Sequence, residues 1–257
     1  MLLYNLLLFV LTFIGGSAPI WTQGIDERKT NLLLAFSGSF LLSITLLHLL
    51  PETFGELGHS AGLFVLIGFF VQLLIQRFTH GVEHGHAHVH VTDGHQHDHT
   101  HHHTHEHADT HRIPLVSIVL GLSLHAFMEG LPLGFHYRHE ATTSSLYLAV
   151  AAHKLPEAML LTTLIANYKG RKNAMLLLCI FSLITPAASF LAATLGHQYL
   201  AMSKVVMWLV PVVAGAFIHI ATTIFFESGT RQHMLTFQKT LAILLGVGLG
   251  LTTLLFE

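Results

Sequence analysis

Eight stretches of this sequence are each long and apolar enough to cross a lipid bilayer. A spanning helix needs roughly 20 predominantly apolar residues, and hydrophobic residues make up 52% of the chain against 10% charged residues. Since a spanning segment must satisfy its own backbone hydrogen bonds in lipid, we predict an all-α polytopic membrane protein in which residues 1–257 form a single transmembrane domain. The predicted spans are residues 2–20, 31–51, 60–78, 113–135, 145–166, 173–196, 204–226 and 239–256.

Lysine and arginine fall almost entirely on one side of this predicted membrane. If the N-terminus is outside, nine of them lie in inside loops, two lie outside and one lies within the fifth span. Cytoplasmic loops carry the excess of basic residues, so we expect both termini outside. Residues 1–21 have no basic n-region and no small-residue cleavage site, and are expected to form the first span rather than a removed signal.

A histidine-rich tract separates the third and fourth predicted spans. Residues 80–111 contain fourteen of the chain's 23 histidines, interspersed with Asp, Glu and Thr. Because this tract has too few apolar residues to form a packed core, we expect a cytosolic loop that is disordered without ligand. Such tracts are typical of metal binding; an inert linker or an artificial tag is the alternative, and the irregular, acid-rich pattern disfavours a tag. The candidate loop ligands are His95, His97, His99, His101, His102, His103, His105 and His107.

Two His-x-x-x-Glu pairs lie deep inside the fourth and fifth spans. They are His125 with Glu129 and His153 with Glu157, and positions i and i+4 share one face of a helix. Ionisable residues at this depth are expensive and face a cavity, a partner or a metal. Two facing helices would form a four-ligand site that suits zinc or iron(II). The alternative is that each pair is only a structural hydrogen bond.

Lys154 directly follows His153 and lies several residues inside the fifth span. A cation there offsets part of the negative charge of the carboxylates and repels a second divalent ion. We therefore predict one metal ion at this depth. A lysine that extends to the membrane interface is the alternative.

Three further residues are candidate stations on a metal pathway. His48 and Glu52 are placed at the outer end of the second span, and His219 in the inner half of the seventh. Interfacial residues of these types are also common without any such role.

A faint internal repeat relates the second and seventh spans. Residues 37–40 (Ser-Gly-Ser-Phe) with Thr45 resemble residues 214–217 (Ala-Gly-Ala-Phe) with Thr222. The two spans run in opposite directions, as in inverted-repeat transporters with a site near the midplane. Recurring small-residue packing motifs are the alternative.

Together these features resemble the ZIP family of zinc and iron transporters. The matching motifs are L-L-H-L-L-P-E at residues 46–52, the histidine-rich loop, H-A-F-M-E-G at 125–130 and H-K-L-P-E-A at 153–158. The resemblance implies a 3+2+3 helix arrangement and metal movement into the cytosol. It places the family's first metal site on His125, Glu129, His153 and Glu157.

The chain departs from two-metal members of that family at three positions. Many such members have Asn after the helix 4 histidine, an acid or amide after the helix 5 histidine, and Glu before a proline in helix 6. Here Ala126, Lys154 and Thr185 occupy those positions. The resemblance therefore implies that the second site is absent, with Lys154 as its substitute.

The function expected from these observations is carrier transport of a divalent metal by alternating access. Zn²⁺ is the first expectation and Fe²⁺, Mn²⁺ and Cd²⁺ are acceptable to the same ligands; the metal is the substrate, and no catalytic cofactor or nucleic-acid partner is expected. We expect the protein to be embedded in the lipid bilayer, and it could assemble as a homodimer. An intramembrane zinc hydrolase is the main alternative, although H-E-x-x-H is missing and four protein ligands would close the coordination position that catalysis needs. A cation-diffusion exporter would have six helices and His/Asp pairs.

Acidic pH should weaken uptake, because protons compete with metal for neutral imidazoles. Uptake measured across a range of external pH is expected to fall below about pH 6, near the ordinary pKa of histidine. Uptake that stays constant down to about pH 5 would contradict this expectation.

Overall fold

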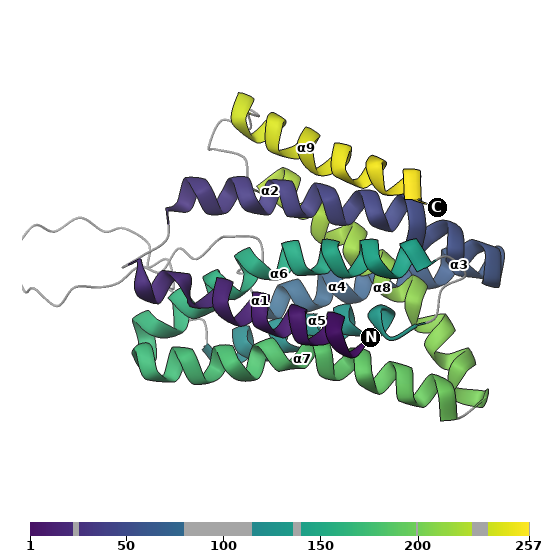
Figure 1. The fold of residues 1–257 in the computed structure, drawn as a ribbon, viewed down its shortest axis with the longest axis horizontal. Coiled ribbons are helices and arrows are strands. Elements are labelled where there is room, and N and C mark those ends of the chain that lie inside the picture. The colour runs from purple at the N-terminus through teal and green to yellow at the C-terminus, as the bar shows by residue number, and fades with distance from the viewer. Residues whose placement is uncertain (23–25, 80–114, 136–139, 199, 228–235, 257) are drawn as a thin grey trace, which may run out of the picture.

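The computed structural model describes residues 1–22, 26–79, 115–135, 140–198, 200–227 and 236–256 (Figure 1). Within these residues the chain is helical almost throughout and contains no strand, which confirms the all-α prediction. The predicted histidine-rich loop, residues 80–111, lies outside the described part. The elements in chain order are α1 (Leu2–Trp21), α2 (Glu27–Ile44), the π-helical turn η1 (Thr45–Leu49), α3 (Leu50–Leu57), α4 (Ser60–Thr79), α5 (Leu115–Leu133), α6 (Glu140–Lys169), α7 (Arg171–Gln198), α8 (Leu200–Glu227), α9 (Phe237–Thr253) and the short 3₁₀ turn η3 (Leu254–Phe256).

The predicted spans coincide with these helices. Seven helical segments within the described residues are long and apolar enough to cross a membrane, and α9 is a shorter apolar helix of 17 residues. Seventeen residues is the lower end of the range for spanning hydrocarbon, so α9 corresponds to the eighth predicted span but is shorter than the other seven. The second span is longer than predicted: α2, η1 and α3 form one continuous segment, Arg28–Leu57.

Local sequence features explain where these helices bend and turn. The second span changes to π geometry at Thr45–Leu49, the turn that contains His48. Pro51 follows this turn within the same continuous segment, where it has no N–H to donate to the preceding turn. Gly58 and Gly170 have positive φ angles of 57° and 81°, which glycine adopts without a steric penalty. They allow the sharp reversals from α3 to α4 and from α6 to α7.

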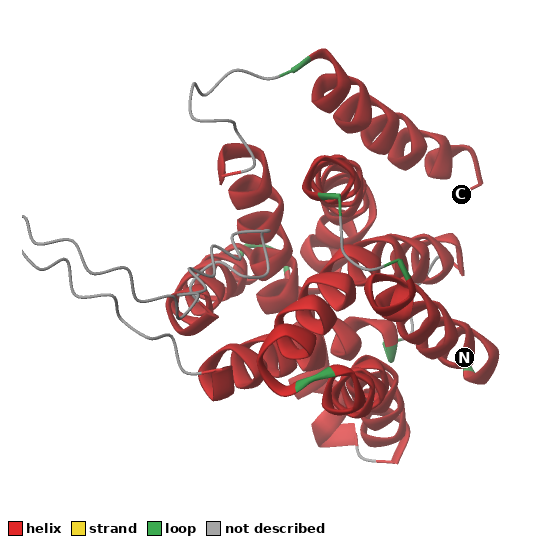
Figure 2. Ribbon diagram, turned by 90° about the vertical axis from the view of Figure 1, so that its left-hand side faces the viewer, coloured by secondary structure: helices red, strands yellow, loops and turns green. Residues whose placement is uncertain are grey.

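The helices form one bundle in which four pairs have the most extensive contacts (Figures 1 and 2). These pairs are α4 with α8, α2 with α9, α1 with α6, and α5 with α7. Exchanging α1 with α7, α2 with α8, α4 with α9 and α5 with α6 maps this set of pairs onto itself. The contacts thus follow an internal two-fold relation, with three spans before and three spans after the central pair α5 and α6. This supports the predicted repeat.

Glycines at equivalent places close the two matching interfaces. A Cβ atom on Gly68 of α4 would collide with the backbone of Val212 in α8, and one on Gly246 of α9 would collide with the backbone of Phe36 in α2. Small residues let membrane helices approach until their backbones touch. A glycine therefore allows close helix packing at the equivalent interface in each half of the molecule.

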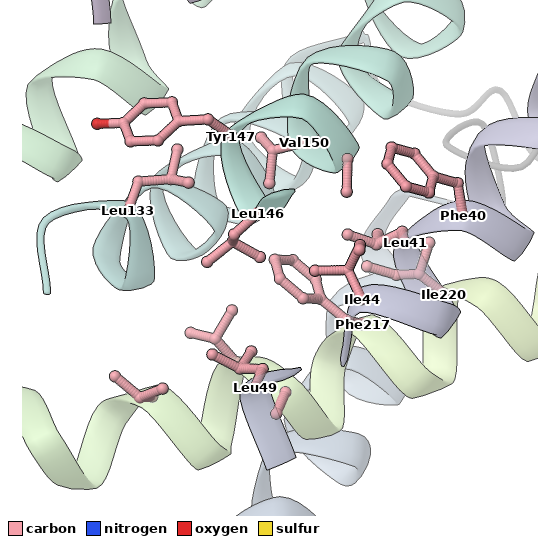
Figure 3. Packing of buried hydrophobic residues seen from close by; sticks show 14 of the residues in the cluster. Phe40, Leu41, Ile44, Leu49, Leu133, Leu146, Tyr147, Val150, Phe217 and Ile220 are labelled. Carbon is pink, nitrogen blue, oxygen red and sulfur yellow. The ribbon is translucent and has the colours of Figure 1, made fainter. Parts of the chain in front are cut away.

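The largest apolar cluster fills the space between α2, α6 and α8 (Figure 3). Phe40, Leu41 and Ile44 of α2 pack against Phe217 and Ile220 of α8. A second cluster joins α5, α6 and α7, with buried residues that include Leu122, Ala158, Leu178 and Phe181. Both clusters include residues of α5 and α6, so the central helices are buried along their inward faces.

The glycine interface predicts a position-dependent effect within α9. Gly246→Ala should lower the stability of the detergent-solubilised protein by about 1–3 kcal/mol, because the new methyl group meets the backbone of α2. Gly248→Ala is the matched control, since a Cβ there meets nothing within 4 Å and alanine favours the helix by about 0.5–1 kcal/mol. Thermal unfolding compares the two variants. Equal melting temperatures would contradict the close contact between Gly246 and α2.

Candidate metal centre

Four predicted ligands from two helices meet inside the bundle. His125 and Glu129 project from α5, and His153 and Glu157 project from α6. One ligand atom from each lies within 4.8 Å of the others, and all four side chains are at most 1% exposed. Among the described residues, these four alone form a group of His, Cys, Asp or Glu side chains with this geometry.

The distances between ligand atoms are close to those of a tetrahedral metal site. The Nε2 atom of His125 lies 3.1 Å from Glu129 Oε1 and 4.0 Å from Glu157 Oε1, and the Nε2 atom of His153 lies 3.9 Å from Glu129 Oε1. Tetrahedral zinc with bonds of about 2.0–2.1 Å places its ligand atoms about 3.3–3.4 Å apart. A small contraction of the group is therefore enough to complete such a site.

Several polar atoms of the cluster have no hydrogen-bond partner among the described residues. These include both ring nitrogens of His153 and the Oε1 atom of Glu157. Buried polar atoms are normally paired, and leaving one unpaired costs about 1–3 kcal/mol. A bound cation would satisfy the Nε2 and Oε1 atoms together, so the cluster fits a divalent metal ion better than it fits a purely structural pair.

Lys154 joins the two carboxylates. Its Nζ atom lies 2.5 Å from Glu129 Oε2 and 2.5 Å from Glu157 Oε2, and the side chain is 1% exposed. The ring of Phe181 on α7 covers the ammonium group, with its centroid 4.8 Å from Nζ. The geometry agrees with the counter-ion that the sequence predicted and excludes a lysine that reaches the membrane interface.

Close packing against α7 fixes the ligand-bearing part of α5. A Cβ on Gly130 would collide with the carbonyl oxygen of Thr185, and a Cβ on Gly134, just past the end of α5, would collide with that of Ser189. The hydroxyl of Thr185 donates a hydrogen bond of 2.9 Å to the carbonyl oxygen of Ala126. Because Ala126 follows His125 in the chain, this bond ties the histidine's turn of α5 to α7.

Apolar residues seal the centre in both directions along α6. Ala149 and Val150 precede His153 and belong to the first cluster, whereas Ala158 and Leu161 follow Glu157 and belong to the second. The ligands, at most 1% exposed, therefore occupy a compartment that is closed by apolar packing on both sides along α6.

The predicted pathway residues lie outside this compartment. His48 in η1 is buried, with its Nε2 atom 2.6 Å from Thr253 Oγ1 at the end of α9, and Glu52 follows it in α3, partly buried. The Nε2 atom of His219 lies 2.7 Å from Gln76 Oε1 of α4. Both histidines thus make hydrogen bonds between helices, and their part in conduction stays a prediction.

Two residues of the site were not identified as partners from the sequence. Phe181 and Thr185 lie one turn apart on α7 and contact Lys154 and the backbone of Ala126. The sequence marks Thr185 only as the residue that replaces a glutamate ligand of two-metal members, and no sequence pattern marks Phe181. Contacts between helices that are distant in the chain decide both roles.

A family model described as ZIP Zinc transporter matches residues 1–253 of the chain. A comparison with curated proteins finds no significant match.

Removing the lysine should destabilise the metal-free protein. Lys154→Met leaves two carboxylates buried without their cation, which typically costs about 3–5 kcal/mol. Lys172→Met on the exposed start of α7 is the control, and thermal unfolding in a chelator compares the two. Equal melting temperatures for the two variants would contradict the structural role of the lysine.

Proposed function

Because the chain belongs to the ZIP zinc transporter family, we propose that it carries Zn²⁺ across the membrane into the cytosol by alternating access. The observation that carries this proposal is the buried group of His125, Glu129, His153 and Glu157, whose ligand atoms lie within 4.8 Å of one another. Family membership supports divalent metal transport by an integral membrane protein. The ion, the direction and the mechanism are the proposed parts.

The donor set supports zinc as the substrate. Two imidazole nitrogens and two carboxylate oxygens match the ligands and the four-coordinate geometry of zinc. Fe²⁺, Mn²⁺ and Cd²⁺ are further candidates because the same atoms accept them. The ion is cargo and not a catalytic cofactor, so the protein is proposed to be a transporter and not an enzyme.

The closed compartment supports alternating access over a continuous pore. The ligands are no more than 1% exposed, and apolar residues flank them on both sides along α6. In the proposed cycle the ion enters past His48 and Glu52, exchanges its waters for the four ligands, and leaves past His219. The hydrogen bonds of His48 to α9 and of His219 to α4 would then change as each end opens.

The distribution of basic residues supports the proposed direction. By the positive-inside rule, both termini are expected outside and residues 80–111 in the cytosol, so an ion that leaves past His219 would emerge on the side of the histidine-rich loop. Histidines 95–107 of that loop are proposed to bind the arriving metal.

Uptake of radioactive zinc into proteoliposomes tests the proposal. Wild type should accumulate zinc, whereas His153→Ala and Glu157→Ala should lose uptake because each removes one of four ligands. His59→Ala, at an exposed position before α4, is the control for loss of a histidine and should transport normally. Variants that fold but keep full uptake would exclude the central site, and a wild type inert to every divalent metal would exclude the carrier.

A further inference from the structure

Each carboxylate of the centre divides its two oxygen atoms between different partners. The Oε2 atoms of Glu129 and Glu157 both lie 2.5 Å from Lys154 Nζ. The Oε1 atoms face the imidazoles instead: that of Glu129 lies 3.1 Å from His125 Nε2 and 3.9 Å from His153 Nε2, and that of Glu157 lies 4.0 Å from His125 Nε2. Lysine and histidines therefore contact opposite sides of the two carboxylates.

We infer that Lys154 keeps both Oε2 contacts when the metal binds, and thereby restricts each glutamate to one metal bond and selects ions that accept four ligands. This inference rests on the proposed function and concerns the same site. Lys154 is in this view a positioning residue that never touches the metal.

The surroundings of Lys154 favour its staying in place. The ammonium group is buried, bonds to two carboxylates and lies under the ring of Phe181 at 4.8 Å. A lysine that left the carboxylates would become an unpaired charge in a low-dielectric interior, which is strongly unfavourable. Glu157 is also its neighbour one turn along α6, so the contact requires no movement between helices.

The charges of the occupied site then suit a carrier. When both imidazoles are neutral, the two carboxylates and the Lys154 ammonium give the site a net charge of −1. A bound divalent ion changes this net charge to +1. The ammonium and the metal repel each other across the shared carboxylates, which weakens binding and helps release. A conducting site must bind its ion firmly enough to accept it and weakly enough to release it.

Selectivity follows from the number of oxygen atoms that remain. Zinc is satisfied by four ligands in a tetrahedron, and two nitrogens with two single oxygens supply them. Mn²⁺ prefers six oxygen-rich ligands in an octahedron, and the occupied Oε2 atoms deny it the bidentate carboxylates that would raise its coordination number. Lys154 therefore disfavours manganese relative to zinc.

Cobalt(II) absorption tests the geometry in the unaltered chain. Tetrahedral Co²⁺ absorbs visible light much more strongly than octahedral Co²⁺, so the purified full-length protein with Co²⁺ should show the intense tetrahedral bands. Subtracting the spectrum of His125→Ala/His153→Ala removes the contribution of Co²⁺ bound elsewhere, including residues 80–111. A difference spectrum typical of six-coordinate cobalt would overturn the inference without any variant of Lys154.

Competition during uptake tests the role of the lysine. Lys154→Gln should lower the preference for Zn²⁺ over Mn²⁺ by about tenfold, equivalent to about 1.4 kcal/mol, because both carboxylates become free to bind through two oxygens. Lys172→Gln, at the exposed start of α7, should keep the wild-type ratio. An unchanged ratio in Lys154→Gln that still transports would overturn the inference, whereas a wild type that transports no metal would instead refute the proposed function.

Discussion

Two carboxylates buried at the depth of a membrane require a cation, and the centre of this protein is built around that requirement. Lys154 supplies it from one residue beyond His153, with its ammonium group between Glu129 and Glu157. A lone buried ionised group is so unfavourable that it changes protonation or finds a partner. A permanent internal cation therefore allows the metal-free site to stay charged, and it leaves one oxygen of each carboxylate directed toward the imidazoles.

This electrostatic centre depends on the close approach of the surrounding helices. Gly130 brings α5 against the backbone of α7, and Gly16 brings α1 against Ala158 of α6. Each ligand-bearing helix therefore packs closely against a neighbouring helix through a glycine. Lipid offers little hydrophobic driving force between helices, and packing of this kind stabilises them instead. The outer pairs, α2 with α9 and α4 with α8, also pack through glycines.

Much of this arrangement could be predicted from the sequence, because membrane helices need long apolar segments and the spacing of four residues places His and Glu on one face. These two rules gave the spans and the four clustered residues, and the sequence also predicted Lys154 as a counter-ion. The π turn at Thr45–Leu49 was not predicted, since its sequence also suits an α-helix. Nor were the partners of His48 and His219, which come from α9 and α4. Such contacts depend on how helices that are distant in the chain pack together, and the spacing of residues within one helix does not predict this packing.

Anomalous X-ray diffraction at the zinc absorption edge, from crystals of the zinc-loaded full-length protein, would show whether one metal ion occupies the four-ligand cluster. We expect one zinc peak inside the bundle, about 2.0–2.2 Å from one atom of each of four ligands: His125, Glu129, His153 and Glu157. Lys154 would still contact the second oxygen of both glutamates. Two zinc peaks within this cluster, or a bundle with no peak there, would contradict this expectation.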